Sequence, residues 1–232
     1  MPGQFALYGS PIATAVDRVR LTLAEGQFTD FDFVQLNLWK QEHKTAEFLE
    51  RHPHGRVPVL TTPEGVNIYE SRAIARYLTA RYNFPLVPPA SDLLATARFE
   101  QAVSSEASYF DSPSGKLAAQ SFIFPLFGKK PNEAIVAEAR EELAAYFDIC
   151  ESQFAKHGNK FMAGDLFTLA DIFYVPLIAR MVERGNGDLI EKRPNMKAWW
   201  ERCLARPATG KFVEGIKFDE MYKAIQSQRA SM

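Results

Sequence analysis

The sequence predicts an α/β domain followed by an all-helical domain, and two features of the chain support this prediction. Up to about residue 82, short apolar segments with strand patterns alternate with segments of helical spacing, whereas the chain beyond residue 92 has helical spacing only. Residues 83–92, NFPLVPPASD, hold three prolines and show no periodicity, which is typical of a linker. We therefore expect domains at residues 1–82 and 93–232, joined by a linker at 83–92.

The first domain is predicted to contain a small mixed sheet with helices on both sides. Its first helix keeps rough helical spacing of apolar residues and is expected to turn Asp17 and Arg18 towards solvent. Residues 62–65, TPEG, have the composition of a turn and join two short strands into a hairpin. In chain order, the predicted elements are a strand at 4–8, a helix at about 13–26, a strand at about 31–35, a helix at 45–51, strands at 57–60 and 66–69, and a helix at 71–82.

The second domain is predicted to consist of amphipathic helices. Thr168 and Asp171 have the spacing of a capping box, with Asp in place of the usual Glu or Gln, and Phe167 and Ile172 are placed to form a hydrophobic staple around it. The predicted helices run from residue 93 to about 110, over residues 133–157, from residue 168 and from residue 194; the second has an inner stripe of Ala139, Leu143, Ala144, Phe147 and Phe154.

The composition excludes several classes of protein. The 232 residues are 47% hydrophobic and 24% charged, which is the balance of a globular protein. A formal charge of −1 argues against nucleic acid as a partner, and no apolar run is long enough to span a membrane. The amino terminus lacks the features of a signal peptide. Cys150 and Cys203 form no CxxC pair and the four histidines form no spaced ligand set, so we expect a soluble, cytoplasmic protein without disulfide scaffold or metal.

Two pairs of residues in the first domain are candidates for a binding site. Pro58 is either a trans proline at a strand start, which the local sequence alone favours, or a cis proline that turns the N–H and C=O of Val57 towards an extended peptide-like ligand. Ser71 is either a simple helix N-cap or part of a helix start whose free amides bind a carboxylate. Glu70 beside it could then hold an ammonium, so the pair would suit an α-amino acid end group.

At these positions the chain resembles a known family. LYGSP at 7–11, DRVRLTL at 17–23, EHKTAEFLERHPHGRVPVL at 42–60 and YESRAIARYL at 69–78 resemble the glutathione-binding half of cytosolic glutathione transferases. The EHK…HPHGRVP pattern and FIFPLFG at 122–128 are similar to the phi class of plants and fungi. The resemblance covers nearly the whole chain. It implies a thioredoxin-like domain followed by an all-α domain, glutathione as co-substrate with no other cofactor, and a homodimer.

The resemblance also implies where glutathione lies. Without the resemblance, His43 and Lys44 would be interpreted as residues of an ordinary charged loop in solvent. The γ-glutamyl end is expected at Glu70 and Ser71, the cysteinyl amide at Val57 held by a cis Pro58, and the glycine carboxylate at His43 and Lys44 with Arg56 close by.

The reacting position departs from the phi pattern. Where such sequences have a serine at the start of the first helix, this chain has Ala13. Thr14 either caps the helix or replaces the missing hydroxyl, and Ser10 is the second candidate. Lowering a thiol pKa by about two units gains only about 3-fold in reactivity once the lower nucleophilicity is included, so positioning of the electrophile must supply most of the rate.

The electrophile is expected against apolar side chains. For each candidate the alternative is ordinary helix core. Phe122 and Phe124 are the more promising, because they lie in an apparently irregular stretch around a proline. The candidates are Ile12, Tyr109, Phe122 and Phe124, with Phe110 and Phe127 as further possibilities.

Three classes of function follow from the resemblance. The favoured one is an enzyme that conjugates glutathione to small hydrophobic electrophiles, in detoxification, or reduces hydroperoxides with it. The alternatives are a non-catalytic carrier of ligands and a protein-interaction module of the same fold. The paired features at Val57-Pro58 and Glu70-Ser71 favour the two functions that bind glutathione over the third.

Overall fold

The computed structural model describes residues 3–230, except for the side chains of residues 224 and 227–230. Contacts within the chain divide it into two compact units, one up to Val87 and one from Pro88. We call them the sheet unit and the helical unit. The division falls inside the segment predicted as a linker, residues 83–92.

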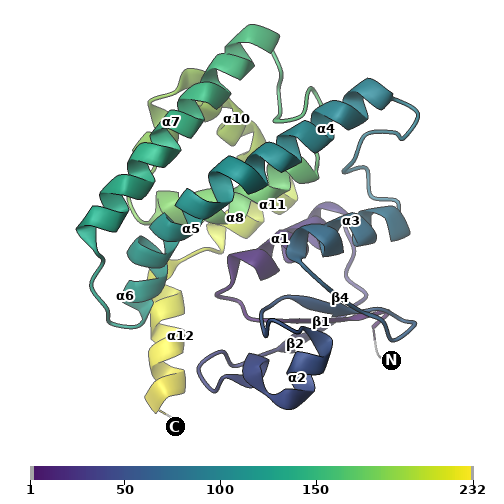
Figure 1. The fold of residues 1–232 in the computed structure, drawn as a ribbon, viewed down its shortest axis with the longest axis vertical. Helices are drawn as coiled ribbons and strands as arrows, with labels where there is room; N and C mark the ends of the chain where they lie inside the picture. Colours follow the sequence, from purple (N-terminus) through teal and green to yellow (C-terminus); the bar gives the residue numbers. More distant parts are fainter. Residues whose placement is uncertain (1–2, 231–232) are drawn as a thin grey trace. The chain divides into compact units, whose positions relative to one another are not determined.

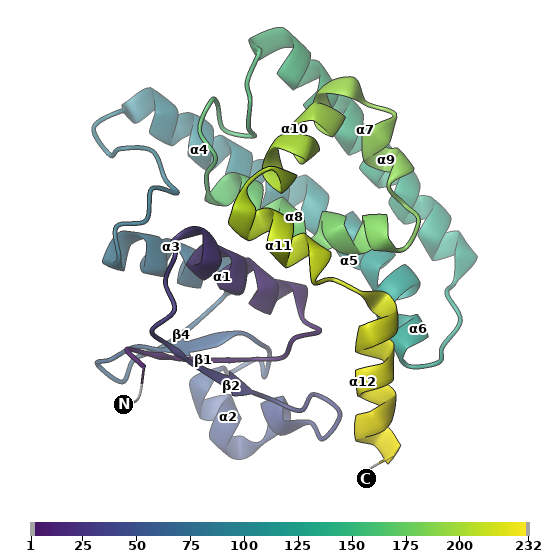
Figure 2. The same cartoon turned by 180° about the vertical axis from the view of Figure 1, so that it is seen from behind.

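The sheet unit is a four-stranded mixed sheet with helices on both faces (Figure 1). Its elements are β1 (Ala6–Gly9), α1 (Thr14–Glu25), β2 (Asp32–Gln35), the 3₁₀ turn η1 (Glu42–Lys44), α2 (Ala46–Arg51), β3 (Val59–Thr61), β4 (Asn67–Tyr69) and α3 (Ser71–Arg81). The strand order is β2-β1-β3-β4, with β1 parallel to β2 and the other two pairs antiparallel. Helices α1 and α3 pack together on one face, and α2 lies on the other (Figures 1 and 2). The predicted sequence of elements is therefore confirmed.

Apolar side chains of the central strands and of α1 and α3 form the core of this unit. Leu7 of β1 stands opposite Phe33 on one side and Leu60 on the other, and both leucines are fully buried. Burying a side chain of this size stabilises the fold by about 1.5–3 kcal/mol. The helices add Val16, Val19, Leu21 and Leu23 from α1 and Ile74, Ala75 and Leu78 from α3.

Asp17 and Arg18 are buried, so the prediction that they face solvent was wrong. The carboxylate of Asp17 lies 3.6 Å from the guanidinium of Arg20, which offsets part of the cost of burying its charge. Every residue from Val16 to Val19 is buried. Apolar spacing identifies the face of a helix that meets the sheet, but it contains no information on what covers the remaining faces.

The helical unit contains one long helical run followed by shorter helices (Figure 1). The run extends further than the predicted helix at 93–110, because two π-helical turns, η2 and η3, join successive α-helices without a break. The elements are α4 (Leu93–Ser105), η2 (Glu106–Phe110), α5 (Asp111–Ala118), η3 (Ala119–Ile123), α6 (Phe124–Leu126), α7 (Glu133–His157), α8 (Leu169–Glu183), α9 (Asp188–Glu191), α10 (Pro194–Leu204), α11 (Pro207–Glu214) and α12 (Phe218–Ala230).

Helix α8 is the centre of the helical unit. Every residue from Leu169 to Met181 is buried, as expected of a helix that is apolar on all sides. Its start has the predicted capping box, in which the Thr168 amide donates to Asp171 at 2.9 Å. The same carboxylate accepts a hydrogen bond from the indole of Trp199 in α10. Asp171 thus closes the helix start and connects it to a second helix.

None of the helices described between residues 3 and 230 combines the length and the apolar character that a membrane-spanning helix needs. Within the same residues, no three His, Cys, Asp or Glu side chains are grouped so that they could hold a metal ion.

Candidate functional site

The peptide bond between Val57 and Pro58 is cis, which decides between the two alternatives left by the sequence. Pro58 is buried, and the ladder of β3 begins only at Val59, opposite Tyr8. In the described part of the chain, neither the N–H nor the C=O of Val57 has a hydrogen-bond partner. A main-chain donor and acceptor are therefore free to pair with an extended peptide.

Glu70 and Ser71 lie where β4 runs into α3. The N-cap of α3 is Glu70, with φ 70° and ψ 110°, and Ser71 is the first helical residue. The interpretation of Ser71 as a simple N-cap was therefore wrong. Glu70 is exposed, and its carboxylate has no hydrogen-bond or ion-pair partner among the described residues. A positive φ is uncommon for a residue with a side chain and is often found at binding sites.

His43 and Lys44 form the end of η1 and lie against the segment 54–56. The ammonium of Lys44 donates to the carbonyl of His54 at 3.1 Å. Gly55 has φ +55°, and a Cβ there would lie 2.7 Å from the carbonyl oxygen of His43. Glycine at this position thus lets the two segments approach closely. Burial, followed by the charge of Lys44, lowers the pKa of His43, so this ring is neutral at pH 7.

The two ends of the predicted site meet around His52, a residue that sequence reasoning missed. This imidazole is buried at the end of α2, and its pKa responds to the charges of Glu70, Arg56 and Lys44. The carboxylate predicted to hold an ammonium and the cations predicted to hold a carboxylate therefore lie within electrostatic reach of one ring. The only feature of the sequence that could have identified His52 is its position between the two segments predicted to bind glutathione.

The start of α1 supplies the groups available at the reacting position. Ala13 is the N-cap, and its methyl group makes no capping hydrogen bond. The amides of Thr14 and Ala15 have no acceptor in the described chain. Thr14 is half-buried and Ser10 is 6% exposed, and neither hydroxyl has a partner among the described residues. Free amides at a helix start stabilise an anion.

The apolar candidates have different environments. Ile12, in the sheet unit, is half-buried, and Tyr109, in the helical unit, is 65% exposed. Phe122 is fully buried against Phe218, with ring centroids 5.2 Å apart, so its prediction as a pocket wall was wrong. Pro125 is the second residue of α6, and the chain around it stays helical instead of becoming irregular; the carbonyl of Ser121, four residues earlier, accepts from Arg184 at 2.9 Å.

Of the remaining aromatic candidates in the helical unit, Phe124 and Phe127 are half-buried, and Phe110 is core, packed on Tyr174 at 4.7 Å.

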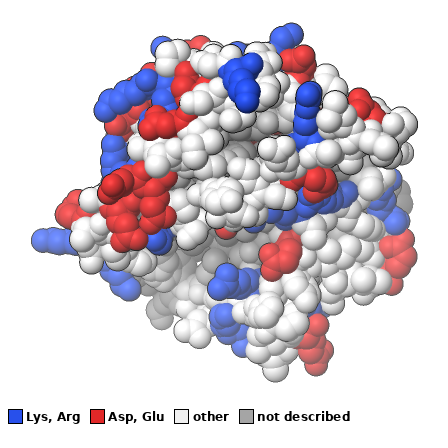
Figure 3. All heavy atoms as spheres, turned by 45° about the horizontal axis from the view of Figure 1, so that its top comes forward, with Lys and Arg blue, Asp and Glu red and all other residues white. Residues whose placement is uncertain are grey.

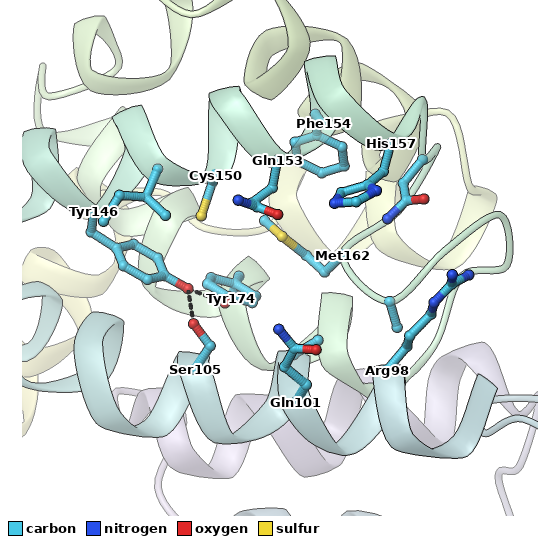
Figure 4. Close-up of a pocket in the computed structure, with 14 residues that line it drawn as sticks. Arg98, Gln101, Ser105, Tyr146, Cys150, Gln153, Phe154, His157, Met162 and Tyr174 are labelled. Atoms are coloured by element: carbon cyan, nitrogen blue, oxygen red, sulfur yellow. Dashed lines mark hydrogen bonds between the residues drawn. The ribbon is translucent and has the colours of Figure 1, made fainter. Parts of the chain in front are cut away.

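A separate cavity of about 310 Å³ lies entirely within the helical unit (Figure 4). The hydroxyls of Ser105, Tyr146 and Tyr174 form a hydrogen-bonded chain along its wall. The thiol of Cys150 lines the same wall, and burial raises its pKa to about 11. Cys150 is therefore a poor nucleophile, and Cys203 is fully buried.

Charges of both signs are interspersed on the face shown in Figure 3. On the face shown in Figure 3, Lys and Arg side chains lie singly or in small groups, and one compact acidic group is visible at the left. This distribution lacks the continuous basic stripe that a nucleic acid would need on this face.

Known proteins share both the sequence and the fold. The N-terminal domain model of glutathione S-transferases matches residues 7–88, and the C-terminal domain model matches residues 116–207. Glutathione S-transferase PM239X14 of Arabidopsis thaliana is 40% identical over 201 residues, which are 85% of this chain and 90% of that protein. Glutathione transferase F7 from Populus trichocarpa has a TM-score of 0.85 and 30% identity, covering 92% of this chain and all of that one.

A third similar protein was solved with a ligand. Glutathione S-transferase I from maize, in complex with an atrazine glutathione conjugate, has a TM-score of 0.82 and 28% identity, over 91% of this chain and 97% of that one. The matching family models, the identity and the shared two-domain fold show that the chain belongs to the glutathione S-transferase family, among transferases of the phi class.

Proposed function

We propose that this transferase binds glutathione along the sheet unit and joins its sulfur to small hydrophobic electrophiles. The observation that carries the proposal is the unpartnered main chain of Val57, together with the unpaired carboxylate of Glu70. The cysteinyl amide pairs with Val57. The γ-glutamyl ammonium meets Glu70 while its carboxylate meets the helix start at Ser71.

The glycine end of glutathione lies at the cations of the same unit in this proposal. Lys44 and Arg56 are exposed, and His43 presents a neutral ring beside them. The glycine carboxylate of glutathione is attracted to the two cations. Each charge-assisted hydrogen bond to it contributes about 1.5–3 kcal/mol to the free energy of binding.

The sulfur lies at the start of α1 in this proposal. The free amides of Thr14 and Ala15 and the Thr14 hydroxyl stabilise the thiolate after the thiol proton passes to water. With an aryl halide, the sulfur electron pair forms the new S–C bond and the halide leaves with the electrons of the broken bond. With a hydroperoxide, the thiolate takes one oxygen and releases the alcohol, and a second glutathione then gives water and the disulfide.

The electrophile is placed by apolar side chains, for which the remaining candidates are Ile12, Tyr109, Phe124 and Phe127. The maize relative solved with an atrazine glutathione conjugate supports a chlorinated aromatic compound as a trial substrate. We expect a detoxifying role in the cytoplasm with no cofactor besides glutathione. A homodimer is supported by large apolar side chains left exposed on the helical unit, which include Leu93, Leu94 and Ile149.

Calorimetry with glutathione and a conjugation assay with chlorodinitrobenzene test the proposal together. We expect the wild type to bind and to turn over, and Glu70→Gln to bind glutathione at least about 10-fold more weakly, because a charged hydrogen bond is lost. Glu191→Gln, an exposed carboxylate of the helical unit, is the matched control. The absence of binding heat in the wild type would disprove the proposal.

A further inference from the structure

His52 lies between the two ends of the proposed glutathione site and makes none of the contacts proposed above. It is 2% exposed, and its Nδ1 is buried without a hydrogen-bond partner. Its ring stacks on Tyr69, with centroids 4.6 Å apart and planes 23° from parallel. The ring of His54 stands edge-on to both, at 5.9 and 6.4 Å. The imidazole of His52 therefore acts as a flat packing surface and makes no hydrogen bond through Nδ1.

Tyr69 ends β4 immediately before the unusual backbone of Glu70. A residue with a side chain keeps a positive φ only where its surroundings hold it. On the helix side, the amide of Ile74 donates to the carbonyl of Glu70 at 2.9 Å. On the strand side, Tyr69 is held by its pairing with Val59 and by the ring of His52. β4 is an edge strand, so no further strand holds Tyr69 from outside.

We infer that His52 is a positioning residue, whose ring, through the stack on Tyr69, holds Glu70 where its carboxylate meets the α-ammonium of glutathione. The inference rests on the proposed function, since it needs glutathione at Glu70. Burial is the main cause that lowers the pKa of His52. The charge of Glu70 acts in the opposite direction and raises this pKa, whereas the charges of His54, Arg56 and Lys44 lower it further. The ring is thus neutral at pH 7 and leaves the carboxylate of Glu70 to the ligand.

The backbone of His52 supports the glycine end independently of its side chain. Its amide donates to Phe48 at 3.0 Å, and its carbonyl accepts from Gly55 at 2.7 Å. These bonds and the bond from Lys44 to the carbonyl of His54 remain in His52→Ala. The main chain at the glycine end is therefore held by hydrogen bonds that do not involve the ring.

Two ligands separate this role from general loosening of the site. Calorimetry compares glutathione with glutaryl-cysteinylglycine, which is glutathione without its α-amino group. We expect His52→Ala to weaken binding of glutathione by about 2- to 13-fold, the range for a stacked ring pair, and to leave binding of the analogue unchanged. His52→Phe keeps a flat ring and should restore glutathione binding to within about twofold of wild type. His157→Ala, an exposed histidine of the helical unit, is the control.

Tyr69→Ala removes the same stack from the other side and gives a second test. Tyr69 is 37% exposed on an edge strand, so its truncation leaves the core intact even if His52→Ala fails to fold. Tyr69→Ala should also weaken the binding of glutathione and leave the binding of the analogue unchanged. The double variant, with both His52 and Tyr69 replaced by Ala, should bind glutathione no more weakly than either single variant.

Several results would overturn the inference. One is that His52→Ala or Tyr69→Ala weakens the binding of glutathione and of the analogue equally. Another is that His52→Phe binds glutathione as weakly as His52→Ala does. Wild-type protein that binds neither ligand would instead disprove the proposed function itself.

Discussion

Asp171 provides a direct test of how the helical unit is held together. Its side chain is completely buried and accepts three N–H donors, from Met162 at 2.9 Å, Thr168 at 2.9 Å and the Trp199 indole at 2.8 Å. Two of these hydrogen bonds, from Thr168 and Trp199, are fully buried. The hydroxyl of Thr168 adds a longer bond of 3.4 Å.

Asp171→Ala leaves the two buried donors without a partner. Each unsatisfied buried donor costs about 1–3 kcal/mol, so the free energy of unfolding should fall by about 2–6 kcal/mol. This is a large part of the total stability of a protein, which is about 5–15 kcal/mol. Asp171→Asn keeps one acceptor oxygen but turns an amide donor towards the Thr168 amide, and it should lose about 1–3 kcal/mol. Thr168→Ala removes the long bond and the side-chain acceptor of the capping box, and it should lose about 0.5–2 kcal/mol.

Urea unfolding followed by tryptophan fluorescence measures these losses, because Trp199 and Trp200 lie in the helical unit. The expected order of destabilisation is Asp171→Ala, then Asp171→Asn, then Thr168→Ala. A matched control is Asp165→Ala, an exposed carboxylate before the helix. If Asp171→Ala were no less stable than Thr168→Ala, the argument from unsatisfied donors would be refuted.

Three further predictions concern single side chains. In the conjugation assay, Thr14→Ala should lower kcat/KM more than Ser10→Ala, because Thr14 is the first residue of α1; equal activity in wild type and both variants would remove both hydroxyls from the mechanism. Iodoacetamide should alkylate Cys150 about 10- to 20-fold more slowly at pH 8 than an exposed thiol, because burial raises its pKa to about 11 and leaves about 0.1% thiolate, which the higher nucleophilicity of that thiolate offsets only in part; labelling as fast as that of an exposed thiol, detected by mass spectrometry, would contradict this. The hydrogen bonds from Arg140 lower the pKa of Asp188, so the stability they add is complete above the ordinary value of 3.8 and is lost as the pH falls through the folded-state pKa. Asp188→Asn should therefore be less stable than wild type at pH 7, with the difference shrinking below pH 3.8, and a difference that does not change with pH would exclude the ion pair as its source.

Local patterns predicted most of the fold. The helix at 133–157 was predicted with the bounds it has in the structure, because its apolar stripe is a property of neighbouring residues; in the structure Asn132 caps its start and Gly158 stands at its end. The same holds for the capping box at Thr168 and for the hairpin around residues 62–65. Ala144 of the predicted stripe is only half-buried, while Tyr146 is buried, since its hydroxyl finds partners on Ser105 and Tyr174. Partners distant in the sequence cannot be found from spacing.

The candidate site was predictable only in part. The family resemblance supplied the residues for glutathione, and the structure supplied the cis bond at Pro58, the conformation of Glu70 and the free amides at Thr14 and Ala15. The structure also excludes Phe122 from the residues predicted to contact the electrophile, because the π turns keep that stretch helical and the ring lies in the core.

The sequence by itself determined the order of the elements, the division into two domains and the residue types available for binding glutathione, because periodicity, caps and turns depend on neighbours along the chain. Only the tertiary structure decided which polar side chains are buried and which are left without partners. Asp17 and His52 are polar residues that sequence patterns do not distinguish from surface residues, and both are buried in the folded chain. The environment of a side chain, and with it its charge and its partners, depends on contacts made across the fold.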